Sequence, residues 1–172
     1  MQNILLQNIV HIDKDVKTHS FFYDALQQVS NTSNYWTFTD ARDAYKTLIS
    51  KKITPDIIFM DLEFSKMSGH EFLARIKKYE HLKNIPVIII SDSSKRSTMQ
   101  LTRILGAKGF VPKPYNQREL ISILFSILSV DFLMRPQPML SSFARLQQHQ
   151  IADSISEDFF WSGATEYGFY LN

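Results

Sequence analysis

Four polar residues stand where apolar segments end, and their side chains together suit phosphoryl chemistry: Asp13, Asp61, Ser91 and Lys113. Asp61 is the most informative, because a carboxylate after four large apolar residues is costly unless it emerges into a polar crevice. Carboxylate oxygens bind Mg²⁺, and a lysine ammonium binds phosphate as a point charge. A carboxylate that is not committed to a metal can act as a nucleophile and form an acyl phosphate. The four types therefore indicate a site for Mg²⁺ and a phosphoryl group, if the fold brings them together.

Alternating strand and helix patterns supply such a fold. Short apolar or β-branched runs predict strands at 9–12, 35–39, 57–60, 86–91 and 109–112. Helical periodicity with capping residues predicts helices at 15–29, 40–49, about 72–79, 95–105 and from 116 onward to near Met134. Asp40, Asp92 and Asn116 are interpreted as helix caps, and Gly106 as the end of the fourth helix. Five β-α units predict an α/β protein with a parallel sheet covered by helices on both faces. In such sheets, ligands bind beyond the carboxyl ends of the strands.

Composition narrows the class of protein. The 172 residues suit one domain with an appendage, and the absence of cysteine excludes disulfides and thiolate chemistry. No apolar stretch is long enough to span a bilayer and no signal peptide is evident, so we expect a cytoplasmic protein with no membrane partner. The net charge of +2 is too small and too dispersed to indicate nucleic-acid binding.

Residues 8–128 resemble the receiver domain of two-component response regulators. The resemblance rests on six pieces in order: Ile12-Asp13, Pro55 to Asp61, Met67-Ser68-Gly69, Ile85 to Ser91, Gly106-Ala107 and Lys113-Pro114-Tyr115. It implies a doubly wound, flavodoxin-like, five-stranded sheet of order 2-1-3-4-5. It also implies a stand-alone signalling protein of the CheY-like kind, which is not an enzyme beyond catalysing its own phosphorylation.

The resemblance assigns a role to each site residue. Asp61 would be the phospho-acceptor, and Asp13, Asp61 and the backbone carbonyl of Glu63 would hold Mg²⁺. Lys113 would bind the phosphoryl group, across a bond to Pro114 that is usually cis in the family.

Two further positions would report phosphorylation. Ser91 stands at the family's switch hydroxyl, which swings to the phosphoryl oxygen. Phe110 stands at the switch aromatic, whose rotamer follows Ser91.

Lys14 is the one departure from the family pattern, because a second acidic residue usually follows the first Asp and contacts Mg²⁺. A cation there repels the metal. Lys14 either points away and leaves a weakened metal site, or it is compensated by a carboxylate from Glu63 or Asp15, or it pairs with Asp61 and mimics the metal. We favour retained but weakened Mg²⁺ binding, since two carboxylates suffice for this ion.

Residues 129–172 form a C-terminal extension distinct from the receiver domain at 1–128. The extension carries 2 basic and 5 acidic residues, a moderate helical stripe, and six aromatic residues after position 158. So much apolar area favours packing, either on its own domain or on a second copy in a homodimer, although a loosely packed terminus is the alternative. The resemblance does not extend to it.

The leading hypothesis is a receiver protein that takes a phosphoryl group onto Asp61 from a histidine kinase or phosphotransfer protein. It would signal through contacts with an unidentified downstream protein, because the extension is short and poor in basic residues for a DNA-binding domain. The alternative is a pseudo-receiver, a binding module that Lys14 has made unable to accept phosphate. A small enzyme is disfavoured, because the site has no His base and no Gly-rich nucleotide loop.

Overall fold

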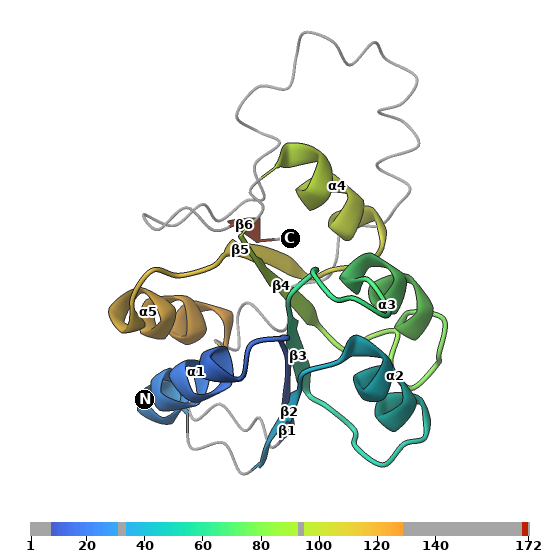
Figure 1. Cartoon of the computed structure of the whole chain (residues 1–172), viewed down its shortest axis with the longest axis horizontal. Coiled ribbons are helices and arrows are strands. Elements are labelled where there is room, and N and C mark those ends of the chain that lie inside the picture. The colour runs from blue at the N-terminus through green and yellow to red at the C-terminus, as the bar shows by residue number, and fades with distance from the viewer. Residues whose placement is uncertain (1–7, 31–33, 93–94, 129–169, 172) are drawn as a thin grey trace, which may run out of the picture.

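A parallel sheet forms the centre of the computed structural model, which describes residues 8–30, 34–92, 95–128 and 170–171 (Figure 1). Its parallel strands are β1 (Asn8–Ile12), β2 (Asn34–Phe38), β3 (Ile57–Met60), β4 (Val87–Ser91) and β5 (Gly109–Pro112). They lie in the order β2-β1-β3-β4-β5, as predicted. Strands β3 and β4 are buried throughout, which explains why their sequences are apolar except for Ser91 at the end of β4.

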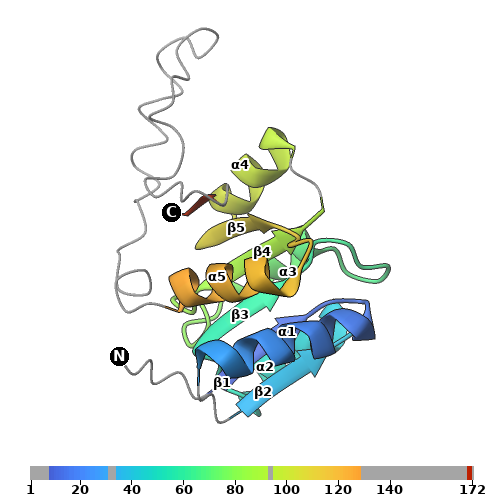
Figure 2. The ribbon, with the colours of Figure 1, turned by 90° about the vertical axis from the view of Figure 1, so that its left-hand side faces the viewer.

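Helices cover both faces of this sheet. They are α1 (Val16–Val29), α2 (Ala41–Ile49), α3 (Gly69–Ile76), α4 (Arg96–Ile104) and α5 (Gln117–Ile127). Helices α1 and α5 pack together on one face, and α2 and α3 lie on the other, with α4 beyond them near β5 (Figures 1 and 2). The arrangement is the predicted doubly wound α/β fold. Within the described ranges, no helix is both long and apolar enough to cross a membrane.

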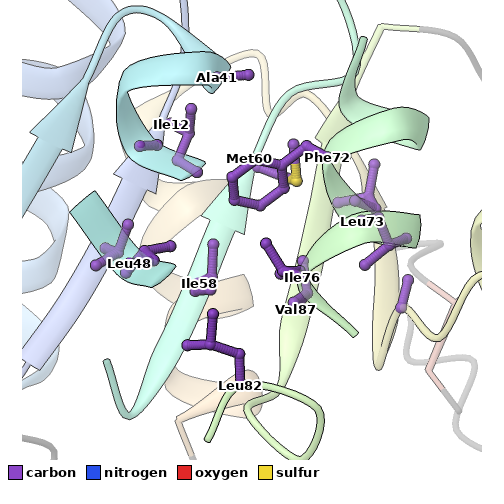
Figure 3. Packing of buried hydrophobic residues seen from close by; sticks show 14 of the residues in the cluster. Ile12, Ala41, Leu48, Ile58, Met60, Phe72, Leu73, Ile76, Leu82 and Val87 are labelled. Atoms are coloured by element: carbon purple, nitrogen blue, oxygen red, sulfur yellow. The ribbon is translucent and has the colours of Figure 1, made fainter. Parts of the chain in front are cut away.

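Two hydrophobic clusters hold the layers together, one on each face of the sheet. The larger joins β1, β3 and β4 to α2 and α3, and Figure 3 shows its centre, where Ile12, Ile58 and Met60 of the strands meet Leu48, Phe72 and Ile76 of the helices. The second packs α1 and α5 against the opposite face, around Phe22, Phe59 and Leu124. Each cluster therefore fixes the helices from which the loops at the strand ends emerge.

Side-chain caps set where most helices begin. Asp15, Asp40, Ser68 and Asn116 each accept a backbone N–H from the first turn of α1, α2, α3 and α5 respectively. The predicted capping box of α5 is modified, because the Glu119 carboxylate accepts from the amide of Tyr115, one residue earlier than the box requires.

The fourth helix lies close to the predicted residues 95–105, but its N-terminal cap differs from the prediction. Its N-cap is Lys95, which makes no side-chain capping bond, so the interpretation of Asp92 as its cap is wrong. Gly106 closes the helix in the left-handed region at φ 95°. The amides of Gly106 and Ala107 then donate to the carbonyls of Arg103 and Thr102, which is a Schellman motif.

The C-terminal extension contributes one described element. Strand β6 (Tyr170–Leu171) pairs antiparallel with β5 and adds a sixth strand to the five that were predicted. The other expectations for the extension, including the end of the fifth helix near Met134 and the helical stripe, fall on residues 129–169, outside the described residues.

Candidate functional site

The register of the sheet brings the two aspartates to the same edge. Strands β1 and β3 pair in parallel with Ile12 opposite Met60, so Asp13 and Asp61 leave the sheet side by side. The Asp61 amide donates to the Ile12 carbonyl at 2.9 Å, which continues the ladder by one step. Both residues are almost completely buried, with exposed fractions of 3% for Asp13 and 2% for Asp61. Two carboxylates buried so close together require a cation.

Lys113 supplies that cation. Its Nζ lies 2.9 Å from Asp61 Oδ2, 3.5 Å from Asp13 Oδ2 and 3.5 Å from Asp92 Oδ2. Burial opposes the charged form of Lys113, but the hydrogen bond and attraction to Asp61, with Asp13 and Asp92 adding to them, raise its pKa above the ordinary value. The ammonium is therefore charged across the physiological pH range.

Backbone amides orient the other oxygen of each aspartate. Asp61 Oδ1 accepts from the Leu62 amide at 2.6 Å, and Asp13 Oδ1 accepts from the Asp15 amide at 2.9 Å. Each carboxylate thus has one oxygen held by the main chain and one directed at Lys113. Because the amides fix the carboxylate planes, both aspartates are positioned before any ligand arrives.

Gly69 allows the loop after Asp61 to close tightly. Its amide donates to the Leu62 carbonyl at 2.9 Å. A Cβ at this position would lie 2.8 Å from the Asp61 carbonyl oxygen and 2.6 Å from Leu62 Cα, closer than side chains approach backbone. Glycine is therefore required for α3 to begin against the segment that carries Asp61.

Lys14 is turned toward Glu63. Its Nζ lies 3.0 Å from Glu63 Oε2, and the two side chains are 54% and 62% exposed. The hydrogen bond to Glu63 raises the pKa of Lys14, and the same bond lowers the pKa of Glu63. Two of the three arrangements considered for Lys14 are not found among the described contacts. Among those contacts, Lys14 forms no ion pair with Asp61, and neither proposed carboxylate compensates for it, because Glu63 pairs with Lys14 and Asp15 caps α1. Lys14 and Glu63 instead line an open groove of about 480 Å³ beside the site.

The remaining predicted residues lie in the next two strands. Ser91 ends β4 and is 1% exposed, and its carbonyl accepts the Lys113 amide at 3.1 Å, which ties the two strand ends together. Phe110 is fully buried in β5. The expected cis bond between Lys113 and Pro114 is wrong for this structure, because no peptide bond in the described residues is cis. Trans is the lower-energy form of such bonds, and Lys113 reaches Asp61 from it.

The oxygen atoms at the strand ends provide the smallest set of protein ligands that Mg²⁺ commonly takes. Mg²⁺ commonly takes one or two carboxylates and keeps several waters, so Asp13 and Asp61 with one backbone carbonyl are an adequate set. No group of three or more His, Cys, Asp or Glu suited to a metal occurs in the described part of the chain. The Glu63 carboxylate is engaged by Lys14. The residues therefore fit a hydrated Mg²⁺ held by two carboxylates.

Asp92 is the site residue that the sequence did not identify. Its carboxylate faces Lys113 from the end of β4, and its side chain is 73% exposed. The signal was its place directly after Ser91 at a strand end, which is the same position that Asp13 and Asp61 occupy after their strands.

Comparison with known proteins identifies the class to which this fold and site belong. Residues 9–125 match the family described as the response regulator receiver domain, and the chain belongs to that family. It is 32% identical over 73 residues to the chemotaxis protein CheY of Treponema pallidum, a match covering 42% of this chain and 49% of that protein.

Solved structures show the same fold. The phosphorylated cyanobacterial phytochrome response regulator RcpA aligns with a TM-score of 0.65 and 24% identity, over 77% of this chain and 99% of that one. The Mn²⁺-bound form of response regulator Rcp1 aligns with a TM-score of 0.60 and 22% identity, over 77% and 99%. The matches to curated relatives span less than half of the length of those relatives.

Proposed function

We propose that the chain is a phosphorylation-dependent signalling receiver, in which Asp61 accepts a phosphoryl group from a phosphohistidine of a sensor kinase or phosphotransfer protein. The observation that carries the proposal is the buried aspartate pair with one Lys113 ammonium directed at both carboxylates. This arrangement concentrates a nucleophile, a metal-ligand set and a phosphate-binding cation at one sheet edge. The phosphorylated state of RcpA and the metal-bound state of Rcp1 support it by analogy.

In the proposed transfer, an oxygen of the Asp61 carboxylate attacks the phosphorus of the donor. The P–O bond to Asp61 forms as the P–N bond to the donor imidazole breaks, and the released imidazole takes a proton from solvent. Lys113 moves with the phosphoryl oxygens and neutralises their charge, while the Leu62 amide keeps the carboxylate in line. The residues act by positioning and charge, because this reaction requires little other chemistry from the protein.

A Mg²⁺ ion would be held by Asp13, Asp61 and the backbone carbonyl of Glu63, and it would supply charge neutralisation to the phosphoryl group. Lys14 lowers the affinity for Mg²⁺, because its positive charge lies at the same edge of the sheet as the aspartates. The ion pair with Glu63 limits that effect by holding the ammonium away from Asp61. We therefore expect the protein to bind Mg²⁺, but weakly.

Phosphorylation would be reported through Ser91 and Phe110 to a downstream protein. The Ser91 hydroxyl is buried at the end of β4, next to the strand that carries Phe110. A hydroxyl drawn to the phosphoryl oxygen leaves space into which the Phe110 ring turns, so the phosphate selects one of two packings. The pseudo-receiver alternative, in which Lys14 replaces an acidic metal ligand, gains no support from the match to the receiver-domain family, and Lys14 pairs with Glu63 and not with Asp61.

Mass spectrometry after treatment with acetyl phosphate and Mg²⁺ tests this function. The wild-type chain should gain one phosphoryl group, Asp61→Asn should gain none, and Asp24→Asn should behave as wild type, since Asp24 lies on an exposed part of α1. An adduct that survives Asp61→Asn would show that the acceptor is wrong. No adduct on the wild type, with one appearing on Lys14→Asp, would establish the pseudo-receiver instead.

A further inference from the structure

Strand β5 has an occupied outer edge. Its inner edge pairs with β4, and its outer edge pairs antiparallel with β6, with Gly109 opposite Leu171 and Phe110 opposite Tyr170. Both views of the ribbon place β6 beside β5 (Figures 1 and 2). A sheet edge presents a row of unpaired N–H and C=O groups, and an extended segment can add to it through main-chain hydrogen bonds. The structure thus contains a strand-binding edge with a segment of the same chain on it.

Exposed apolar side chains flank this edge. On α4, which contacts β5, Leu101 is 44% exposed and Ile104 is 49% exposed. Apolar groups on a helix beside an edge strand give an added segment surface to bury beyond the backbone hydrogen bonds.

The distribution of charge also favours the C-terminal segment as the strand that pairs with β5. Residues 95–118, which build α4, β5 and the start of α5, contain six Lys and Arg and no Asp or Glu. Of the six cations, Lys95, Arg96 and Arg118 are exposed, whereas Lys108 is buried and Lys113 is paired with the site aspartates. Residues 129–172 contain two basic and five acidic residues, and six aromatic residues follow position 158. An acidic, aromatic segment is therefore complementary to α4, which presents the exposed cations Lys95 and Arg96 at its start and exposed apolar residues along its length.

We propose that the β5 edge is a strand-binding surface and that the chain's own C-terminal segment, ending in β6, is its intramolecular occupant. Covalent attachment raises the effective concentration of the segment above that of a free strand, so two paired residues suffice to populate the contact. Because β6 pairs through only two residues, another strand can easily displace it. A partner that adds a strand to β5 must first displace β6, so the segment acts as a cap on this surface. The proposal rests on the sheet pairing and not on phosphorylation of Asp61.

Hydrogen exchange on the full chain tests the cap. Proline at Leu171 removes an N–H from β6 and should speed exchange of the peptide covering β5 by at least about threefold, while β1 and β3 stay protected. Ala164→Pro is the matched control, because it places the same residue in the same segment outside β6. Equal exchange of β5 in the wild type and Leu171→Pro would overturn the proposal.

A synthetic peptide of residues 159–172 tests the occupant. It should bind the full-length Leu171→Pro variant, with its free edge, at least about tenfold more tightly than the wild type, whose edge is filled. A peptide carrying the same proline should bind neither form. Equal binding of the unmodified peptide to both forms, or no binding to either, would overturn the proposal. Light scattering that finds a wild-type dimer and a monomeric Leu171→Pro variant would overturn it too, by showing that the segment docks on a second copy.

Discussion

Replacing Lys113 with methionine should destabilise the fold strongly, because it removes the only ammonium among the described contacts of Asp13 and Asp61 while keeping most of the side-chain volume. At an effective dielectric of about 20, the attraction over 2.9 Å to Asp61 is about 6 kcal/mol, and over 3.5 Å to Asp13 about 5 kcal/mol. Desolvation of the buried ammonium offsets several kcal/mol of this sum.

The two carboxylates also repel each other when the ammonium is removed. Their Oδ2 atoms are at most about 6.4 Å apart, because 2.9 Å and 3.5 Å separate them from the same Nζ, and repulsion at that distance is at least about 2.6 kcal/mol. Breaking a buried ion pair by removing one partner typically costs about 3–5 kcal/mol. We therefore expect the free energy of unfolding to fall by about 3–5 kcal/mol at neutral pH.

Urea denaturation followed by circular dichroism measures this loss, and a double-mutant cycle with Asp61→Asn assigns it. The double variant should recover at least about 1 kcal/mol relative to Lys113→Met, since one uncompensated carboxylate is gone. Lys83→Met is the control, because Lys83 makes a shorter ion pair, 2.7 Å to Glu80, on the exposed surface and should cost at most about 1 kcal/mol. Equal losses for Lys113→Met and Lys83→Met, or strict additivity in the cycle, would refute the reasoning.

Three further predictions concern the surroundings of the site. Gly69→Ala should destabilise the protein by about 1–3 kcal/mol in thermal or urea unfolding, because the added Cβ meets the backbone of Leu62, and an unchanged midpoint would contradict this close approach. Lys14→Met should leave the urea midpoint unchanged, because its pair with Glu63 is exposed, yet it should tighten Mg²⁺ binding measured by calorimetry, and equal affinities would show that Lys14 does not influence the metal. Burial, with smaller effects of His19 and Lys113, lowers the pKa of His11 to about 3. The unfolded state therefore binds the His11 proton at a higher pH than the folded state, and the free energy of unfolding should fall as pH drops from about 6.5 toward 3, by up to about 1.4 kcal/mol per pH unit. Unfolding of wild type and His11→Asn at pH 7 and pH 5 checks this, and an equal pH dependence of the two would contradict it.

The sequence predicted the fold well because the signals that define it are local. Four apolar residues before Asp61 indicate a strand buried on both faces, and the helix-capping residues lie within three residues of the amides that they bind. The strand order came from the resemblance to receiver domains, and the family match and the sheet pairing agree with it. The least accurate helix boundary was that of the third helix, which was predicted at about 72–79 and extends over Gly69–Ile76, because the Ser68 cap that begins it was not identified.

The residues of the site could also be predicted from the sequence, because each polar residue directly follows an apolar run that forms a strand. Asp13, Asp61 and Lys113 meet as expected because parallel strands in register end at one edge. Their roles in phosphoryl transfer remain predictions that the proposed phosphorylation experiment tests. Asp92 was missed because the same position, after a strand and before a helix, also suits a cap.

What the sequence determined by itself, therefore, is the set of elements and the polar residue at each strand end, because hydrophobic period and capping act over a few residues. Only the tertiary structure decided which of several partners Lys14 takes, because Glu63 lies 49 positions away and its approach depends on how two loops leave the sheet. The same holds for the C-terminal strand. Nothing local in Tyr170–Leu171 selects the edge of β5, and its pairing requires the assembled sheet that presents this edge.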